Sequence, residues 1–164
     1  MSENELIPNT IILGERNYSA ALDLVIAQAK DELLIFDQDF ERSNYASLAR
    51  YQLLHDFLSN NPLSKLNIIL HSAEFFTSRC PRLFDLLETY SHKMTVFVTN
   101  DHAKIAKDCF VLSDGRHYCR RFHINQARFK FALDDAEMTA SLTTRFNELL
   151  EETAESVSVT KLGL

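Results

Sequence analysis

A chain of 164 residues, 46% of them hydrophobic, can bury one core of ordinary size. We therefore expect a single domain over residues 1–164, with its core at about 10–155 and a tail at each end. The net charge of −6 argues against a dedicated nucleic-acid or anionic-membrane binder, because such proteins usually carry a basic excess. No apolar run approaches the roughly 18 residues of a membrane span, and three cysteines without a C-x-x-C pair fit a reducing compartment. We expect a cytoplasmic protein without membrane contact.

Helical and strand patterns alternate through the first hundred residues. Three continuous apolar runs bounded by charged or polar residues are typical of strands buried on both faces of a parallel sheet. They are Leu33–Phe36, Leu66–Leu70 and Met94–Val98. Apolar residues at helical spacing predict three helices: one from Ser19 to about Lys30, one from Ala46 to Ser59, and one that Ser78 caps and that ends near Ser91. Between the second strand and the third helix, Phe75–Thr77 is expected to form a loop.

The pair Asp114-Gly115 predicts a β-hairpin. Asp-Gly favours a two-residue type I′ turn, in which both central residues take positive φ, and strand-forming residues lie on either side. If Ser113 pairs with Arg116, the residues divide into two faces. One face holds Cys109, Val111, Tyr118 and Arg120, and the other holds Phe110, Leu112, His117 and Cys119. We expect the second, more apolar face to meet the core, which leaves Arg116, Tyr118 and Arg120 as an exposed basic and aromatic strip. Cys109 and Cys119 then lie on opposite faces, so a disulfide between them is not expected.

The chain closes with one more strand and a helix. Ala127–Leu133 alternates apolar and polar residues, and Asp134 is placed to cap a helix whose core positions include Met138 and Phe146. The element order predicts the α/β class, with a mixed sheet and flanking helices.

Polar residues follow the predicted parallel strands. In open α/β sheets ligands bind beyond the carboxyl ends of the strands. Here these ends carry Asp37 and Asp39, then His71, then the segment Asn100–Lys104. They are candidate ligand-binding residues, and ordinary solvated loop residues are the alternative. No spacing of these side chains predicts a metal site, and no cofactor is implied.

The basic residues of this acidic chain concentrate late in the sequence. They are Arg116, Arg120, Arg121, His123 and Arg128. Guanidinium groups bind phosphates and carboxylates well, so Arg116 and Arg120 are candidates for binding a phosphate-bearing or acidic ligand. A solvated strand face that protects a sheet edge from aggregation is the alternative.

The segment His102-Ala103-Lys104 contains the H-x-K pair of the phospholipase D signature H-x-K-x(4)-D-x(6)-G-S-x-N. Counted from His102, the signature aspartate falls on Cys109, with Asp108 one residue early. Counted back from Asp114, the histidine falls on Lys107 and the lysine on Cys109, while Arg121-Phe122 stands at Gly-Ser.

The order of elements over about residues 20–152 resembles the phospholipase D-like superfamily. Two segments carry the late part of the resemblance: Phe110–Gly115, a strand with its Asp-Gly turn, and Phe129–Asp134, which leads into a helix containing Phe146–Leu150. The resemblance implies a phospholipase D-like sandwich built as a single half-domain with a degenerate motif. It implies a domain without catalysis that acts as a binding or interaction module, because no histidine is placed to form a phosphohistidine. The alternative is a dimeric phosphodiesterase with His102 as nucleophile beside Lys104 and Asp114.

The resemblance also implies a homodimer. The family builds one site from two motifs, and this chain has the length of one half, so two copies are expected to meet about a two-fold axis. The predicted strip around Tyr118 adds arginine and an aromatic residue, types that are enriched at interfaces. A monomer with solvated arginines is the alternative.

Overall fold

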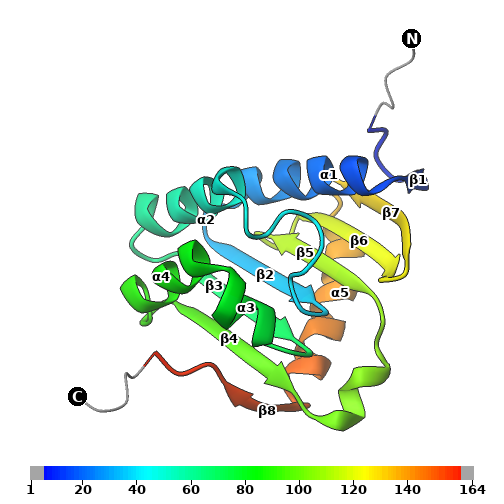
Figure 1. The fold of residues 1–164 in the computed structure, drawn as a ribbon. Coiled ribbons are helices and arrows are strands. Elements are labelled where there is room, and N and C mark those ends of the chain that lie inside the picture. Colours follow the sequence, from blue (N-terminus) through cyan, green and yellow to red (C-terminus); the bar gives the residue numbers. More distant parts are fainter. Residues whose placement is uncertain (1–5, 160–164) are drawn as a thin grey trace.

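The computed structural model describes residues 6–159 and has the predicted α/β class, with a large mixed sheet flanked by helices (Figure 1). The eight strands are β1 (Ile12–Leu13), β2 (Glu32–Asp37), β3 (Lys65–Leu70), β4 (Met94–Thr99), β5 (Cys109–Ser113), β6 (His117–His123), β7 (Gln126–Ala132) and β8 (Thr153–Ser156). The helices are α1 (Glu15–Gln28), α2 (Leu48–Asn60), α3 (Glu74–Arg79), α4 (Pro81–Thr89), the 3₁₀ helix η1 (Asp101–Ile105) and α5 (Ala136–Leu150).

The sheet order is β1-β7-β6-β5-β2-β3-β4-β8. Strands β2, β3 and β4 are parallel, and every other neighbouring pair is antiparallel. Helices α1 to α4 cover one face of the sheet and α5 covers the other (Figure 1). The carboxyl ends of β2, β3 and β4 therefore lie together at one edge of the sheet, where β5 begins and β6 ends.

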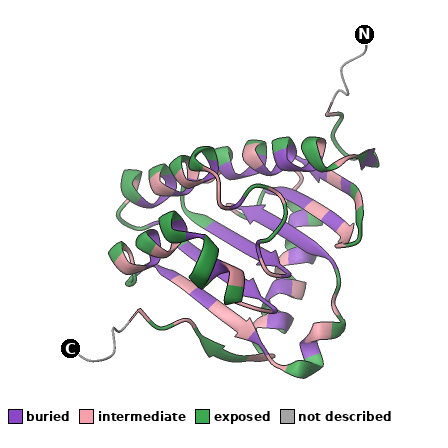
Figure 2. Ribbon diagram, in the orientation of Figure 1, coloured by how far each residue is buried: buried purple, intermediate pink, exposed green. Residues whose placement is uncertain are grey.

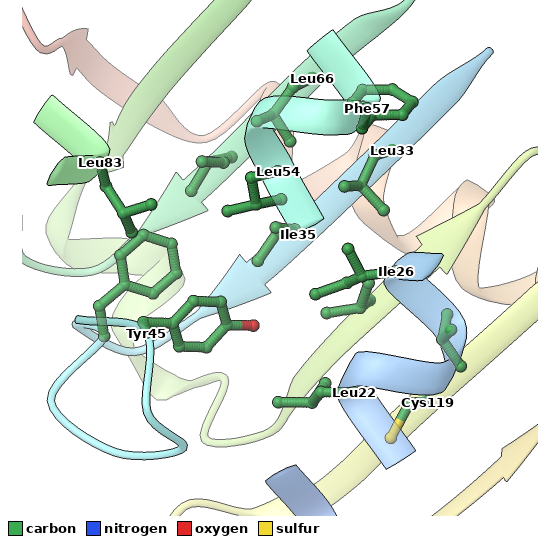
Figure 3. Close-up of a cluster of buried hydrophobic side chains, with 14 of the residues drawn as sticks. Leu22, Ile26, Leu33, Ile35, Tyr45, Leu54, Phe57, Leu66, Leu83 and Cys119 are labelled. Atoms are coloured by element: carbon green, nitrogen blue, oxygen red, sulfur yellow. The ribbon is translucent and has the colours of Figure 1, made fainter. Parts of the chain in front are cut away.

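Both faces of the central strands are buried (Figure 2). In β2, Leu33 and Ile35 point into the larger core beneath α1 and α2, while Leu34 and Phe36 point toward α5. Figure 3 shows the larger core, where Ile26 of α1 and Leu54 of α2 meet the strand side chains. The continuous apolar run in the sequence is explained by this burial on both faces.

The hairpin forms at Asp114-Gly115, and both residues take positive φ, 54° and 67°. The predicted register is wrong by one residue, because Arg116 stays in the turn and Ser113 pairs with His117. The shift moves every β6 side chain to the other face of the sheet. Cys109 and Cys119 consequently share a face; both are buried free thiols.

The predicted exposed strip around Tyr118 is also wrong. Strand β6 lies inside the sheet between β5 and β7, and Tyr118 is 1% exposed against α5. Because both faces of the sheet are covered, a face that looks less apolar in sequence is still buried.

Helix ends also differ from the sequence prediction. Helix α1 begins four residues before Ser19, and Phe75–Thr77 is helical in α3 rather than a loop. The cap of α5 is Asp135, whose Oδ1 accepts the N–H of Met138, while Asp134 takes a positive φ. Local polar residues offer several caps, and only tertiary packing selects one.

The Asp114 carboxylate joins the hairpin to the start of β2. Its Oδ1 accepts the N–H groups of Asp31 (2.8 Å) and Glu32 (2.9 Å), and its Oδ2 accepts that of Lys30 (3.0 Å). The N–H of Asp114 in turn donates to the carbonyl of Glu32 (2.9 Å). One side chain thus satisfies three backbone donors that precede or begin the strand.

We expect Asp114→Ala to lower the free energy of unfolding by about 2–4 kcal/mol, because three donors lose an ionised acceptor and alanine disfavours positive φ. Asp114→Asn is the control. Asparagine tolerates this backbone conformation and keeps one acceptor oxygen, so its loss should be clearly smaller. Urea denaturation followed by circular dichroism measures both losses, and equal stability of the alanine variant and the unmodified chain would contradict this role.

Candidate functional site

The carboxyl ends of β2, β3 and β4 bring Asp37, His71 and Thr99 to one edge of the sheet (Figure 1). This gathering was predicted from the sequence for Asp37 and His71. The segment after β4, with η1, folds back across this edge, since Gln38 Nε2 donates to the carbonyls of Ala106 (3.0 Å) and Asp108 (2.9 Å). The edge is therefore crossed by backbone that binds the strand-end side chains.

Asp37 is buried and holds the turn that follows β2. Its Oδ2 accepts the N–H of Phe40 (2.8 Å) and that of Asp39 (3.3 Å), and Phe40 has a positive φ of 72°. Burial raises the pKa of Asp37 to about 6, while the Phe40 N–H and the Cys109 thiol act in the opposite direction. Both of these hydrogen bonds are local, so Asp37 shapes the turn.

His71 is 8% exposed, and both of its ring nitrogens are engaged. Nε2 lies 2.7 Å from the carbonyl of Ala106, which can only accept, so Nε2 carries the proton. Nδ1 then accepts from the Thr99 hydroxyl at 2.8 Å. Burial lowers the pKa of His71, which agrees with this neutral tautomer. A ring with both nitrogens bound to the protein acts as a structural link between β3, β4 and η1.

Asp39 and Lys104 lie at the same edge of the sheet but apart from each other. Asp39 Oδ1 accepts the N–H of Glu41 (3.0 Å), and its side chain lines a hollow of about 340 Å³ with Ser72 and Arg79. Lys104 Nζ donates to the carbonyl of Thr99 (3.0 Å) and lies 3.9 Å from Asp101. The ammonium is thus turned back onto its own segment.

His102 lies on η1 with its side chain 79% exposed. Its Nδ1 is 2.5 Å from Glu152 Oε2, and this contact raises the pKa of His102. The pair lines a small hollow of about 160 Å³ beside α5.

Asp114 and Arg116 lie at the opposite end of the sheet. Asp114 binds the start of β2, whereas His102 follows the end of β4, which is parallel to β2. Arg116 pairs with Asp134 at the same far end. Within one chain the structure therefore does not bring His102 and Asp114 together, because the length of the strands separates them. It also separates Arg116 from Arg120.

Arg120 belongs to an ion-pair cluster around the buried Asp108 that the sequence did not predict. Asp108, with a side chain 4% exposed, accepts Arg120 Nε at Oδ2 (3.1 Å) and Arg145 Nη2 at Oδ1 (2.5 Å). Arg145 comes from α5 and is 37 residues from Asp108 in the sequence. The one available signal was a polar residue, Arg145, one position before the buried Phe146 in an amphipathic helix.

The positions that match the phospholipase D motif, counted from Asp114, are filled by other chemistry. Cys109, at the lysine position, is 1% exposed, and burial raises the pKa of its thiol well above the usual range. Arg121, at the glycine position, is fully buried and binds Glu15 through both terminal nitrogens (2.6 and 2.9 Å). Its guanidinium carbon also lies 5.4 Å from the centre of the Tyr18 ring.

Within residues 6–159, no three His, Cys, Asp or Glu side chains gather so that they could hold a metal ion. Among the helices of this described part, none has the length and apolar character needed to cross a membrane.

Comparison with known proteins supports the phospholipase D-like fold that the sequence predicted. The model of a family described as "Domain of unknown function (DUF7931)" matches residues 15–162. No curated protein matches the chain. Nuc from Salmonella typhimurium, a phospholipase D family member, is 10% identical with a TM-score of 0.59, and the match covers 91% of this chain and 99% of Nuc. NucT from Helicobacter pylori is 15% identical with a TM-score of 0.56, over 88% of this chain and 96% of NucT.

A further similar structure is TrmBL2, an archaeal chromatin protein. It is 14% identical with a TM-score of 0.66, and the match covers 88% of this chain but 52% of TrmBL2. This chain thus spans about half of TrmBL2 and nearly all of Nuc and NucT. At these identities the likeness establishes the fold: the chain has a phospholipase D-like domain.

The buried Asp37 carboxyl predicts a pH dependence of stability. Its pKa of about 6 in the folded chain exceeds the ordinary value of 3.8, so the folded chain binds this proton more tightly than the unfolded chain. The stabilisation by the protonated form is lost as the pH rises from about 4 to about 6. Relative to Asp37→Asn, the unmodified chain should lose about 2–3 kcal/mol over this window. Urea titrations of both chains at several pH values measure the difference, and a constant difference from pH 4 to 7 would contradict the assignment.

Proposed function

We propose that this chain, which belongs to the DUF7931 family, is a phospholipase D-like domain without catalytic activity that acts as a binding or interaction module. The observation that carries the proposal is the occupation of the motif positions at the strand ends. Arg121 stands where the motif has glycine, and its buried side chain is bound to Glu15. The position of the motif glycine is therefore filled by a large side chain that the protein itself binds.

The missing nucleophile supports the same proposal. Phosphodiester transfer through a covalent intermediate requires a nucleophile with a free electron pair beside the substrate. Lys107 stands at the histidine position, and the Cys109 thiol at the lysine position is buried and held protonated. Neither His71 nitrogen is free, since both are bound within the protein.

The alternative is a phosphodiesterase that uses His102, and one observation favours it. Nδ1 of His102 contacts Glu152, which would orient the ring and leave Nε2 toward solvent. Against it, Lys104 is turned to the Thr99 carbonyl, and Asp114 lies at the other end of the sheet.

A phosphodiesterase assay separates the two functions. With bis(p-nitrophenyl) phosphate as substrate, we expect no hydrolysis above the buffer rate from the unmodified chain or from His102→Ala. Because the His102 side chain is exposed, the substitution should leave the fold intact, which circular dichroism checks. Hydrolysis by the unmodified chain that is lost in His102→Ala would establish the alternative.

We also propose that the domain forms a homodimer. The support is the resemblance to a family that combines two motifs, together with the near-complete coverage of Nuc and NucT by this one chain. The β5–β6 hairpin does not offer an edge for the contact, because β6 is an inner strand. The edge strands of the sheet are β1 and β8, and the exposed side chains of Leu13 in β1 and of Ile11 just before it offer apolar surface.

Light scattering coupled to size-exclusion chromatography tests the dimer. We expect a mass of about 38 kDa, twice the 18.9 kDa of one chain, at micromolar concentration. Leu13→Asp should shift the mass toward the monomer if the β1 edge is the interface, and Leu63→Asp, at another exposed leucine, is the control. A mass of 18.9 kDa at every salt concentration would overturn the dimer and, with it, the dimeric phosphodiesterase.

A further inference from the structure

The hollow between α5 and β6 has the features of an anion site. It measures about 490 Å³ and lies away from the motif positions, on the face of the sheet that α5 covers. We propose that it binds a phosphate monoester, with the guanidinium groups of Arg120 and Arg145 as the anion clamp. The inference rests on the proposed binding function and deepens it by naming the class of ligand.

The two arginines are held in place before any ligand arrives. Asp108 is almost fully buried and accepts one N–H from each, at 3.1 and 2.5 Å. Each guanidinium has five N–H donors in a fixed plane, so most of the donors remain for a ligand. The side chains are 33% and 37% exposed, which keeps them accessible from the hollow that they line.

Arg145 also has a donor without a partner. Its Nε is buried and makes no hydrogen bond within the described part of the chain. A buried N–H that lacks an acceptor carries a desolvation cost that an anion or a water molecule can remove. The clamp is therefore incompletely satisfied by the protein itself.

The rest of the lining fits a phosphate group attached to an organic part. Ser141 adds a hydroxyl, and Met138 and Leu142 add apolar surface beside it. Phosphate oxygens accept charge-assisted hydrogen bonds from guanidinium groups in paired geometry, and the apolar side chains suit a carbon group on the ester.

The surrounding charge favours an anion although the chain as a whole is acidic. Lys130 lies directly opposite Arg120 on the neighbouring strand, and Arg120 and Arg128 both lie against the Phe122 ring, at 5.4 and 5.6 Å from its centre. Glu148 is the acidic residue of the lining and, with Asp108, it balances the two clamp arginines. Lys130 and Arg128 then leave a local excess of positive charge.

Phenyl phosphate is the soluble probe, and binding is followed by isothermal titration calorimetry. We expect Arg145→Gln and Arg120→Gln each to weaken binding at least about tenfold, because each removes a charged donor. Arg82→Gln is the control: it removes the same charge from an exposed arginine on α4, across the sheet, and should change the dissociation constant less than about twofold.

Removal of an arginine from Asp108 could lower the stability of the fold, so a second measurement uses the unmodified chain. In nuclear magnetic resonance spectra the side-chain Nε–H signals of Arg120 and Arg145 should shift on addition of phenyl phosphate, while that of Arg82 should not. Binding without these shifts, or no binding of phenyl phosphate at millimolar concentration, overturns the proposal.

Vesicles distinguish the source of the phosphate. Phosphatidylcholine vesicles that contain phosphatidic acid present the same monoester on a lipid. The source is a lipid headgroup if the unmodified chain binds these vesicles, the Arg145→Gln variant does not, and phenyl phosphate displaces the bound chain. If the unmodified chain does not bind the vesicles, the ligand is soluble. Binding of a single-stranded oligonucleotide but not of phenyl phosphate overturns the proposal. If phenyl phosphate does not bind and the chain also shows no phosphodiesterase activity, this ligand class is excluded while the proposed non-catalytic function still stands.

Discussion

The carboxylate of Asp114 sets the geometry on which the rest of the sheet depends. It accepts three backbone N–H groups at the start of β2 and belongs to the turn between β5 and β6. That contact fixes where β5 pairs with β2, from Leu33 opposite Ser113 to Phe36 opposite Phe110. Because side chains alternate along a strand, this register decides which residues of β5 and β6 lie near the carboxyl end of β2. It also decides which face of the sheet each side chain occupies. The one motif residue retained in this chain is thus explained by the fold.

At the carboxyl ends of β2, β3 and β4, buried polar side chains are bound within the protein. Asp37 holds a turn, His71 links Thr99 to Ala106, and Arg121 binds Glu15. A buried polar group costs free energy unless it is paired, so these contacts stabilise the edge. Asp37 and Arg121 are also almost fully buried, at 3% and 0% exposed. Two partly exposed arginines, Arg120 and Arg145, lie instead on the α5 face.

The architecture could be predicted from the sequence because it depends on local patterns. The apolar runs of β2, β3 and β4 and the helical spacing of α2 each record burial directly, and the structure confirms them. The hairpin register could not be predicted in this way. Whether Arg116 joins the strand or the turn changes every partner in β6, and the choice depends on contacts of Asp114 with residues more than eighty positions away.

The site was predictable to a lesser degree, for the same physical reason. Asp37 and His71 follow parallel strands, so their meeting at one edge follows from topology. The position of Arg145 beside Asp108 depends on how α5 crosses the sheet, which no local pattern records. The short edge strands β1 and β8 were missed because two to four residues carry too little periodicity. The H-x-K pair of His102 and Lys104 lies on the 3₁₀ helix η1 instead of a strand, and Lys104 is turned back to the Thr99 carbonyl, an arrangement that the spacing alone does not indicate.

We predict that no side chain of this domain attacks a phosphodiester, and a search for the covalent intermediate tests this most directly. The chain is incubated with bis(p-nitrophenyl) phosphate, quenched with cold alkali to preserve a phosphoramidate, and measured by intact-mass spectrometry. We predict that the mass of the chain, 18.9 kDa, stays unchanged at every time point. A mass increase that corresponds to one p-nitrophenyl phosphoryl group on His102 would contradict the account.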